Sequence, residues 1–193
     1  MKLVILDRDG TINFLGEEEF FITSPAEWVP IPGALEAIAR LGHAGWRVAV
    51  ATNQPGLGRG LLDVTTLNAI HGLMHKQLAS LGGRIDAVFY CPHTVEENCT
   101  CRKPAPGLLE QICERYGMDP RDVPVIGNCA AHLQAGAALG AQLHLVHTGK
   151  IGVDDGATPA GLPAGTRMHA SLGAVVDYLL APKVAASENA IEK

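Results

Sequence analysis

Residues 2–11 read KLVILDRDGT, so a run of apolar residues leads directly into two acids, Asp7 and Asp9, and a glycine. A short apolar run that ends abruptly in turn residues is typical of a buried strand in a parallel sheet. In open α/β sheets, ligands bind beyond the carboxyl ends of the strands. The two carboxylates are therefore expected to lie in a crevice where chemistry can take place.

The composition is that of an ordinary globular protein: of 193 residues, 47% are hydrophobic and 18% are charged, and the formal net charge is -5. We expect a single domain over residues 1–181, followed by a flexible tail over 182–193. The basic residues are scattered, which argues against a nucleic-acid partner. The chain starts with a core strand rather than a signal peptide, and no apolar run approaches the ~18 residues of a membrane span. We therefore expect a cytoplasmic monomer that does not bind membranes.

Apolar strand patterns alternate with amphipathic helix patterns along the chain. The predicted strands after the first are 47–51, 85–90, 123–126 and 143–146, and the predicted helices are 33–42, 65–81, 106–116, 130–139 and 171–180. Such alternation predicts a doubly wound, Rossmann-like parallel sheet with right-handed crossovers. The remaining segments are interpreted as a flap over the strand ends (12–32), a glycine-rich turn (55–60) and a surface connection (148–168).

Three predicted strand ends carry polar residues, and a lysine precedes the helix at 106–116. These residues are Asp7 and Asp9, Thr52 and Asn53, Gly127 and Asn128, and Lys103. An acid pair, a hydroxyl and a lysine at one edge of a sheet outline a site for phosphoryl transfer. One carboxylate can attack phosphorus, and the second can protonate the leaving oxygen. The lysine and the hydroxyl would hold the phosphoryl oxygens, and a magnesium ion would neutralise the remaining charge.

A second constellation lies in the polar loop after the strand at 85–90. Cys91, His93, Cys99 and Cys101 form the pattern C-x-H-x5-C-x-C. Three thiolates and one imidazole suit tetrahedral zinc, and a complete ligand set leaves no open position, so the zinc would be structural. Unrelated loop cysteines are the alternative. A bound zinc would pin the loop that presents Arg102 and Lys103.

Four short motifs resemble those of the haloacid dehalogenase superfamily of phosphatases: LDRDGT, TNQ, RKP and VIG. The resemblance extends from Lys2 to about Val146. Within it, CPH followed by CTCRKP, together with TNQPGLGRG, resembles the D-glycero-D-manno-heptose 1,7-bisphosphate 7-phosphatases of lipopolysaccharide precursor synthesis. Histidinol-phosphate phosphatase domains share the CPH and CxCRKP pieces, so histidinol phosphate is an alternative substrate. The GRG after TNQ favours the heptose enzymes.

The resemblance implies a haloacid dehalogenase type of fold with a zinc-bound loop and no large cap domain. It also implies a role for each matching residue. Asp7 would be the nucleophile and Asp9 the acid/base, Thr52 and Lys103 the phosphoryl ligands, Asn53, Arg59 and Arg102 the substrate contacts, and Asp7, Asp9 (through its backbone carbonyl) and Asn128 the magnesium ligands. The implied function is magnesium-dependent hydrolysis of a phosphate monoester on a small sugar bisphosphate.

The fourth motif departs from the family pattern GDxxxD, because residues 127–132 read GNCAAH. Asn128 offers magnesium only a neutral oxygen, whereas magnesium sites rely on one or two carboxylates. His132 replaces the acid that would hold Lys103, so Lys103 is expected to be held loosely. Both changes predict weak magnesium binding and attenuated turnover. The alternative is a non-catalytic protein that binds a phosphosugar or regulates a partner.

Four further residues, two histidines and two cysteines, allow predictions. His71 and His75 lie four apart on the helix at 65–81 and are expected to face solvent together. Cys113 falls among inward helical positions and is expected in the core. Cys129, beside Asn128, either lines the site or has a buried structural role.

Overall fold

Six parallel strands form one sheet in the computed structural model, which describes residues 1–16, 20–149 and 158–182. Their order across the sheet is β3-β2-β1-β4-β5-β6. The strands are β1 (Lys2–Leu6), β2 (Trp46–Asn53), β3 (Ala87–Cys91), β4 (Pro124–Gly127), β5 (Gln142–Val146) and β6 (Arg167–His169). Every neighbouring pair is parallel. The predicted doubly wound parallel sheet is confirmed.

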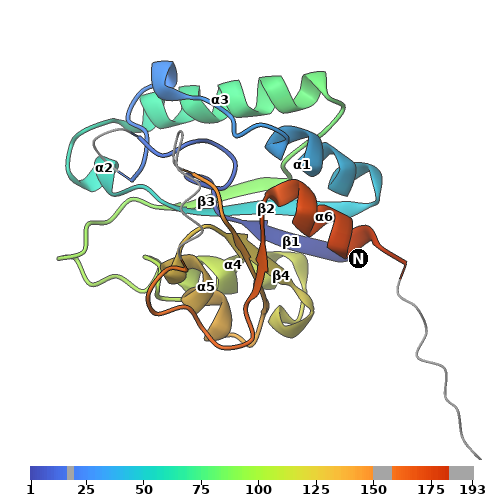
Figure 1. Cartoon of the computed structure of the whole chain (residues 1–193). Helices are drawn as coiled ribbons and strands as arrows, with labels where there is room; N and C mark the ends of the chain where they lie inside the picture. Colours follow the sequence, from blue (N-terminus) through green and yellow to red (C-terminus); the bar gives the residue numbers. More distant parts are fainter. Residues whose placement is uncertain (17–19, 150–157, 183–193) are drawn as a thin grey trace, which may run out of the picture.

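Helices cover both faces of the sheet (Figure 1). On one face lie α1 (Ala34–His43), α3 (Val64–Ser80) and α6 (Leu172–Leu180), and on the other lie α4 (Gly107–Tyr116) and α5 (Ala130–Ala137). Three single-turn elements, η1 (Pro25–Glu27), α2 (Pro55–Gly58) and η2 (Pro120–Asp122), complete the described structure. None of the described helices is long and apolar enough to cross a membrane.

The central strand β1 is buried on both faces, which explains its unbroken apolar run. Val4 and Leu6 join the hydrophobic cluster beneath α1, α3 and α6. Leu3 and Ile5 point to the opposite side and join the cluster beneath α4 and α5. At the end of β1, the backbone N–H of Asp7 donates to the carbonyl of Ile126 at 2.9 Å. Two packed faces and a neighbouring strand therefore hold the point where the two acids emerge.

The structure departs from the predicted elements in three places. The segment predicted as a surface connection contains β6, a strand of only three mostly exposed residues that has no apolar period to reveal it. The predicted glycine-rich turn begins with the short helix α2. The helix predicted to end at residue 81 ends at Ser80, and Leu81, which follows it, is 40% exposed. Residues 17–19, 150–157 and the predicted tail from 183 onward lie outside the described residues.

Candidate functional site

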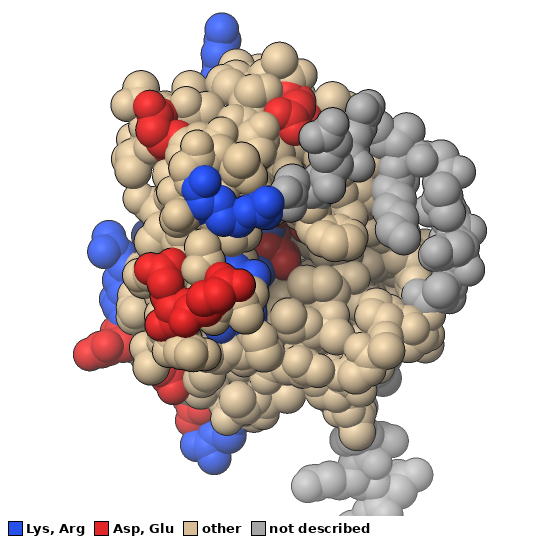
Figure 2. All heavy atoms as spheres, turned by 90° about the vertical axis from the view of Figure 1, so that its left-hand side faces the viewer, with Lys and Arg blue, Asp and Glu red and all other residues tan. Residues whose placement is uncertain are grey.

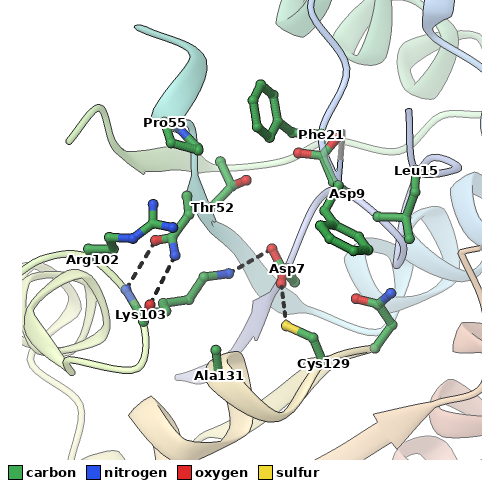
Figure 3. A pocket seen from close by; sticks show the side chains of 13 residues that line it. Asp7, Asp9, Leu15, Phe21, Thr52, Pro55, Arg102, Lys103, Cys129 and Ala131 are labelled. Atoms are coloured by element: carbon green, nitrogen blue, oxygen red, sulfur yellow. Dashed lines mark hydrogen bonds and ion pairs between the residues drawn. The ribbon is translucent and has the colours of Figure 1, made fainter. Parts of the chain in front are cut away.

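A pocket of about 220 Å³ lies where β1, β2 and β4 end. The corresponding face of the molecule is hollowed near its centre, with acidic and basic side chains in and beside the hollow (Figure 2). The lining residues are Asp7, Asp9, Leu15, Phe20, Phe21, Thr52, Asn53, Pro55, Arg102, Lys103, Asn128, Cys129 and Ala131. Three strand ends and the loop before α4 thus meet in one place (Figure 3).

Lys103 is buried in the pocket wall and held firmly. Its Nζ lies 2.7 Å from Oδ1 of Asp7 and donates to the carbonyl of Ala51 at 2.9 Å and to Nδ1 of His132 at 3.0 Å. Burial, and after it the Lys103 charge, lowers the pKa of His132 to about 3, so the imidazole is neutral and accepts a hydrogen bond from Lys103. The prediction that Lys103 is loosely held is therefore wrong, because a neutral histidine acceptor takes the place of the missing acid.

The Asp7 carboxylate is ionised despite its burial. Burial alone would raise its pKa, but the Lys103 charge, the contact with the Lys103 ammonium group and the backbone N–H of Arg8 together hold the pKa below its ordinary value. The Arg8 N–H donates to Oδ1 at 2.8 Å. Only the anion can act as a nucleophile. The environment of Asp7 thus keeps it in the form that can attack an electrophile entering the pocket.

Asp9 sits among nitrogen donors. One terminal nitrogen of Arg8 donates to both carboxylate oxygens at 2.9 Å. Asn13 donates to Oδ1 and Gln54 to Oδ2, each at 2.9 Å. These contacts fix the orientation of the Asp9 carboxylate in the pocket wall, and sequence reasoning missed all three donors.

Thr52 and Asn53 follow one another at the end of β2 but make different contacts. The Thr52 hydroxyl accepts a hydrogen bond from Gln54 at 3.0 Å, which leaves its own proton for a ligand. The Asn53 amide clamps the backbone of Lys103, donating to its carbonyl and accepting from its N–H, both at 3.1 Å. Asn53 therefore holds the backbone of Lys103, and its predicted contact with substrate stays a prediction.

The two predicted substrate arginines lie in different settings. Arg102 lines the pocket and donates to the carbonyl of His93 at 3.3 Å. Arg59 follows α2, is exposed, and is not among the residues that line the pocket. The structure therefore brings Arg102, but not Arg59, to the pocket wall.

Asn128 packs closely against the glycine of the first motif. Its Nδ2 donates to the carbonyl of Thr148 at 3.4 Å, and a Cβ on Gly10 would lie 2.0 Å from that nitrogen. Gly10 also has a φ of 81°, which side chains rarely adopt. The amide oxygen of Asn128 and the carboxylate of Asp7 are hard oxygen donors at the pocket wall. They fit magnesium in kind, although only one of them carries a charge.

Cys129 lines the pocket, which resolves the two alternatives for its place. Its Sγ donates to Oδ2 of Asp7 at 3.6 Å (Figure 3). Burial raises the pKa of the thiol to about 11, with the Asp7 charge adding to the shift. Cys129 is therefore a neutral thiol beside the carboxylate, not a nucleophile.

The four predicted zinc ligands converge. Cys91, His93, Cys99 and Cys101 place their ligand atoms within 4.8 Å of one another. The Sγ atom of Cys101 lies 3.3 Å from Sγ of Cys91, 3.3 Å from Nδ1 of His93 and 3.5 Å from Sγ of Cys99. Ligands of tetrahedral zinc lie roughly 3.5–3.8 Å apart, whereas disulfide sulfurs lie ~2.05 Å apart. The cluster can hold a metal ion.

His71 was expected to face solvent with His75, and this is wrong. His71 is 8% exposed, and its Nε2 lies 3.0 Å from a terminal nitrogen of Arg8, whereas His75 is exposed. The signal that could have found this contact is Arg8 itself, since a guanidinium at the end of a buried strand needs acceptors. Cys113, in contrast, is in the core as predicted, at 4% exposed.

Comparisons with known proteins agree with this geometry. The chain matches the haloacid dehalogenase-like hydrolase family over residues 4–140. It is 49% identical over 180 residues to the D-glycero-beta-D-manno-heptose-1,7-bisphosphate 7-phosphatase of Bordetella bronchiseptica, an alignment that covers 93% of this chain and 98% of the relative. The protein of the same name from Pseudomonas aeruginosa is 46% identical over 179 residues, with the same coverage of 93% and 98%.

A solved structure is similar over nearly the whole chain. It is the D,D-heptose 1.7-bisphosphate phosphatase from B. bronchiseptica complexed with magnesium and phosphate. Its TM-score is 0.86 at 49% identity, and the match covers 93% of this chain and 98% of that one.

Proposed function

Because the chain belongs to the haloacid dehalogenase-like hydrolases, as its motifs predicted, we propose that it hydrolyses a phosphate monoester of a small sugar bisphosphate, with heptose 1,7-bisphosphate as the substrate. The observation that carries this proposal is the ion pair of Asp7 and Lys103, buried at a strand end and open to a pocket. An ionised carboxylate beside a fixed cation is what attack on a phosphoryl group requires.

In the first step, an Asp7 oxygen forms a bond to phosphorus and the bond from phosphorus to the sugar oxygen breaks. The leaving oxygen takes a proton from Asp9, and the product is an aspartyl phosphate. Lys103 and the Thr52 hydroxyl hold the phosphoryl oxygens. Since Lys103 has three acceptors around Nζ, it is in place before a substrate arrives.

In the second step, a water molecule attacks phosphorus and gives a proton to Asp9. The bond between phosphorus and Asp7 then breaks, which releases inorganic phosphate and restores both carboxyl groups to their starting states. Arg102 would contact the remainder of the sugar bisphosphate from the pocket wall, and Asn53 and Arg59 stay proposed substrate contacts.

Magnesium would be held by the Asp7 carboxylate, the Asp9 backbone carbonyl and the Asn128 amide oxygen. When bound, it neutralises charge on the transferring phosphoryl group. The B. bronchiseptica structure is complexed with magnesium and phosphate, which supports a magnesium site in this chain. Since Asn128 is uncharged, we propose that the affinity for magnesium is low.

Zinc is the proposed occupant of the cysteine cluster. Thiolate and imidazole ligands in a compact set of four suit it, and no ligand position remains for catalysis. The zinc would order the loop that carries Arg102. We further propose a cytoplasmic monomer that serves lipopolysaccharide precursor synthesis, in keeping with its relatives' substrate.

Two alternatives remain. A non-catalytic protein that binds phosphosugars is favoured by the neutral fourth motif, Asn128 and His132. Against it stands the complete set of Asp7, Asp9 and Lys103, which such a protein has little physical reason to keep buried together. Histidinol phosphate is the alternative substrate.

A phosphatase screen with added magnesium tests the proposal. Inorganic phosphate is measured after incubation with heptose 1,7-bisphosphate, histidinol phosphate and simple sugar monophosphates. We expect turnover of the heptose bisphosphate well above that of the others. Absence of phosphate release from every compound at high magnesium would contradict the proposal and favour the non-catalytic protein.

A further inference from the structure

Arg8 is a fully buried arginine that lies between the pocket and helix α3. Its side chain is 0% exposed. One terminal nitrogen donates to both oxygens of Asp9 at 2.9 Å, and the other lies 3.0 Å from Nε2 of His71. A line of contacts therefore runs from α3, through the guanidinium, to a carboxylate of the pocket.

The direction of these hydrogen bonds follows from the chemistry of the side chains. A guanidinium has only donors and is always charged, so Nε2 of His71 must accept and the ring hydrogen must sit on Nδ1. A protonated His71 would turn a second cation toward Arg8. The pKa of His71 agrees with this, because burial and then the Arg8 charge lower it to about 3.

Among the described residues, the guanidinium makes its side-chain hydrogen bonds and ion pair with Asp9 and His71 alone. Its Nε is buried without a hydrogen-bond partner, so Asp9 and His71 are the acceptors that compensate for the loss of water. A buried charge is costly unless it is paired and hydrogen-bonded. Removing either acceptor should therefore displace the guanidinium.

Displacement of Arg8 would change Asp9 directly. Without Arg8, Asp9 keeps only the donors Asn13 and Gln54, one on each oxygen. Two single contacts allow the carboxylate to rotate, whereas the shared guanidinium nitrogen ties both oxygens to one plane. A misplaced acid/base transfers protons less efficiently even when the substrate still binds.

We propose that His71 is a positioning residue for the phosphatase reaction: it holds Arg8, and Arg8 orients the Asp9 carboxylate for proton transfer. The inference rests on the proposed function, since it assigns Asp9 as the acid/base. His71 is not among the residues that line the pocket, and its described hydrogen bond is to Arg8, so its effect should fall on kcat rather than on substrate or magnesium binding.

The test compares His71→Leu, which removes the acceptor, with His71→Gln, whose amide oxygen can still accept from Arg8. We expect His71→Leu to lower kcat by about 10- to 100-fold, with KM within about threefold of wild type. His71→Gln should recover most of kcat. His75→Leu, one turn along α3 on the exposed side, is the matched control and should behave as wild type.

Thermal unfolding of each variant shows whether it is folded at the assay temperature. A loss of kcat in a folded variant then reports positioning and not loss of structure. Wild-type kcat in His71→Leu, or equal losses of kcat in both His71 variants, would overturn the inference. If the wild-type protein releases no phosphate, the proposed function fails, and crystal structures of wild type and His71→Leu decide the positioning. Displacement of Arg8 and Asp9 in the variant supports it, and an unchanged Arg8 and Asp9 contradicts it.

Discussion

The pocket and the cysteine cluster are adjacent, yet they are built in different ways. The pocket takes its side chains from three strand ends that are far apart in sequence, and protein groups hold each of them. Lys103, for example, contacts four residues: Asp7, Ala51, His132 and Asn53. The cluster takes its four ligands from one short stretch, the end of β3 and the loop that follows (residues 91–101), and their ligand atoms lie within 4.8 Å of one another.

This difference indicates which site depends on its metal. Protein groups hold the polar side chains of the pocket, so magnesium should tune the chemistry rather than build the site. The cluster brings together thiols that have little reason to converge unless a metal binds them, because loop residues lose conformational entropy on ordering. Arg102 and Lys103 follow the cluster and connect the two regions.

Removal of zinc should cause the largest loss of activity. The Arg102 N–H donates to Sγ of Cys99 and its guanidinium to the carbonyl of His93, so Arg102 should lose its place. Lys103 should keep its place through Asn53. We expect chelated protein or Cys99→Ser to lose most of its activity, mainly by an increase in KM of about tenfold or more.

Metal analysis and kinetics check this prediction. Cys113→Ala is the control, because Cys113 lies in the core outside the cluster and its loss should leave the zinc content unchanged. Protein purified without chelator that contains no zinc would show that the cluster is not a zinc site. A loss confined to kcat would show that Lys103 also depends on the metal.

Introducing the two acids of the family pattern into the fourth motif should change activity by an intermediate amount. Asn128→Asp adds a charged oxygen at the pocket wall and should lower the magnesium concentration for half-maximal activity by about tenfold. His132→Asp should add little, because His132 already gives Lys103 an acceptor. Magnesium titrations of each single variant and of the double variant check this. Equal rates in wild type and the double variant would contradict the claim that the motif attenuates activity.

The pH dependence of stability should show the smallest effect. His71 has a folded-state pKa of about 3, against 6.5 ordinarily, because burial lowers it, followed by the Arg8 charge and the neighbouring His75. Between these values the unfolded chain binds a proton that the folded chain does not. The contribution of neutral His71 to the free energy of unfolding is therefore fully present above about pH 6.5 and is lost as the pH falls towards about 3.

A comparison of wild type with His71→Gln isolates the part of this pH dependence that comes from His71. From pH 7 to pH 5, wild type should lose about 2 kcal/mol more unfolding free energy than His71→Gln. Urea unfolding at both pH values measures the difference. Parallel losses in the two proteins would show that His71 is not held neutral and that the pocket framework is less rigid than described.

The sequence was sufficient where a short pattern carries both the structure and the chemistry. The apolar run before Asp7, the glycine after Asp9 and the spacing of the cysteines each predicted a local arrangement that the structure contains. What could not be predicted depends on contacts between distant segments. The acceptor that His132 gives to Lys103 and the contact of His71 with Arg8 arise from packing across the sheet, over 29 and 63 residues of sequence. The helical pattern places His71 near the edge of the polar face of the helix. It does not show that the buried charge of Arg8 lies opposite.

Acid-quench trapping tests the central claim most directly. Wild-type protein is mixed with heptose 1,7-bisphosphate and magnesium, quenched in acid during turnover, and digested for mass spectrometry. We predict a phosphoryl group on Asp7, and neither this adduct nor phosphate release in Asp7→Asn, which lacks the nucleophile. Magnesium-dependent phosphate release that persists in Asp7→Asn, or an adduct on a residue other than Asp7, would contradict the account.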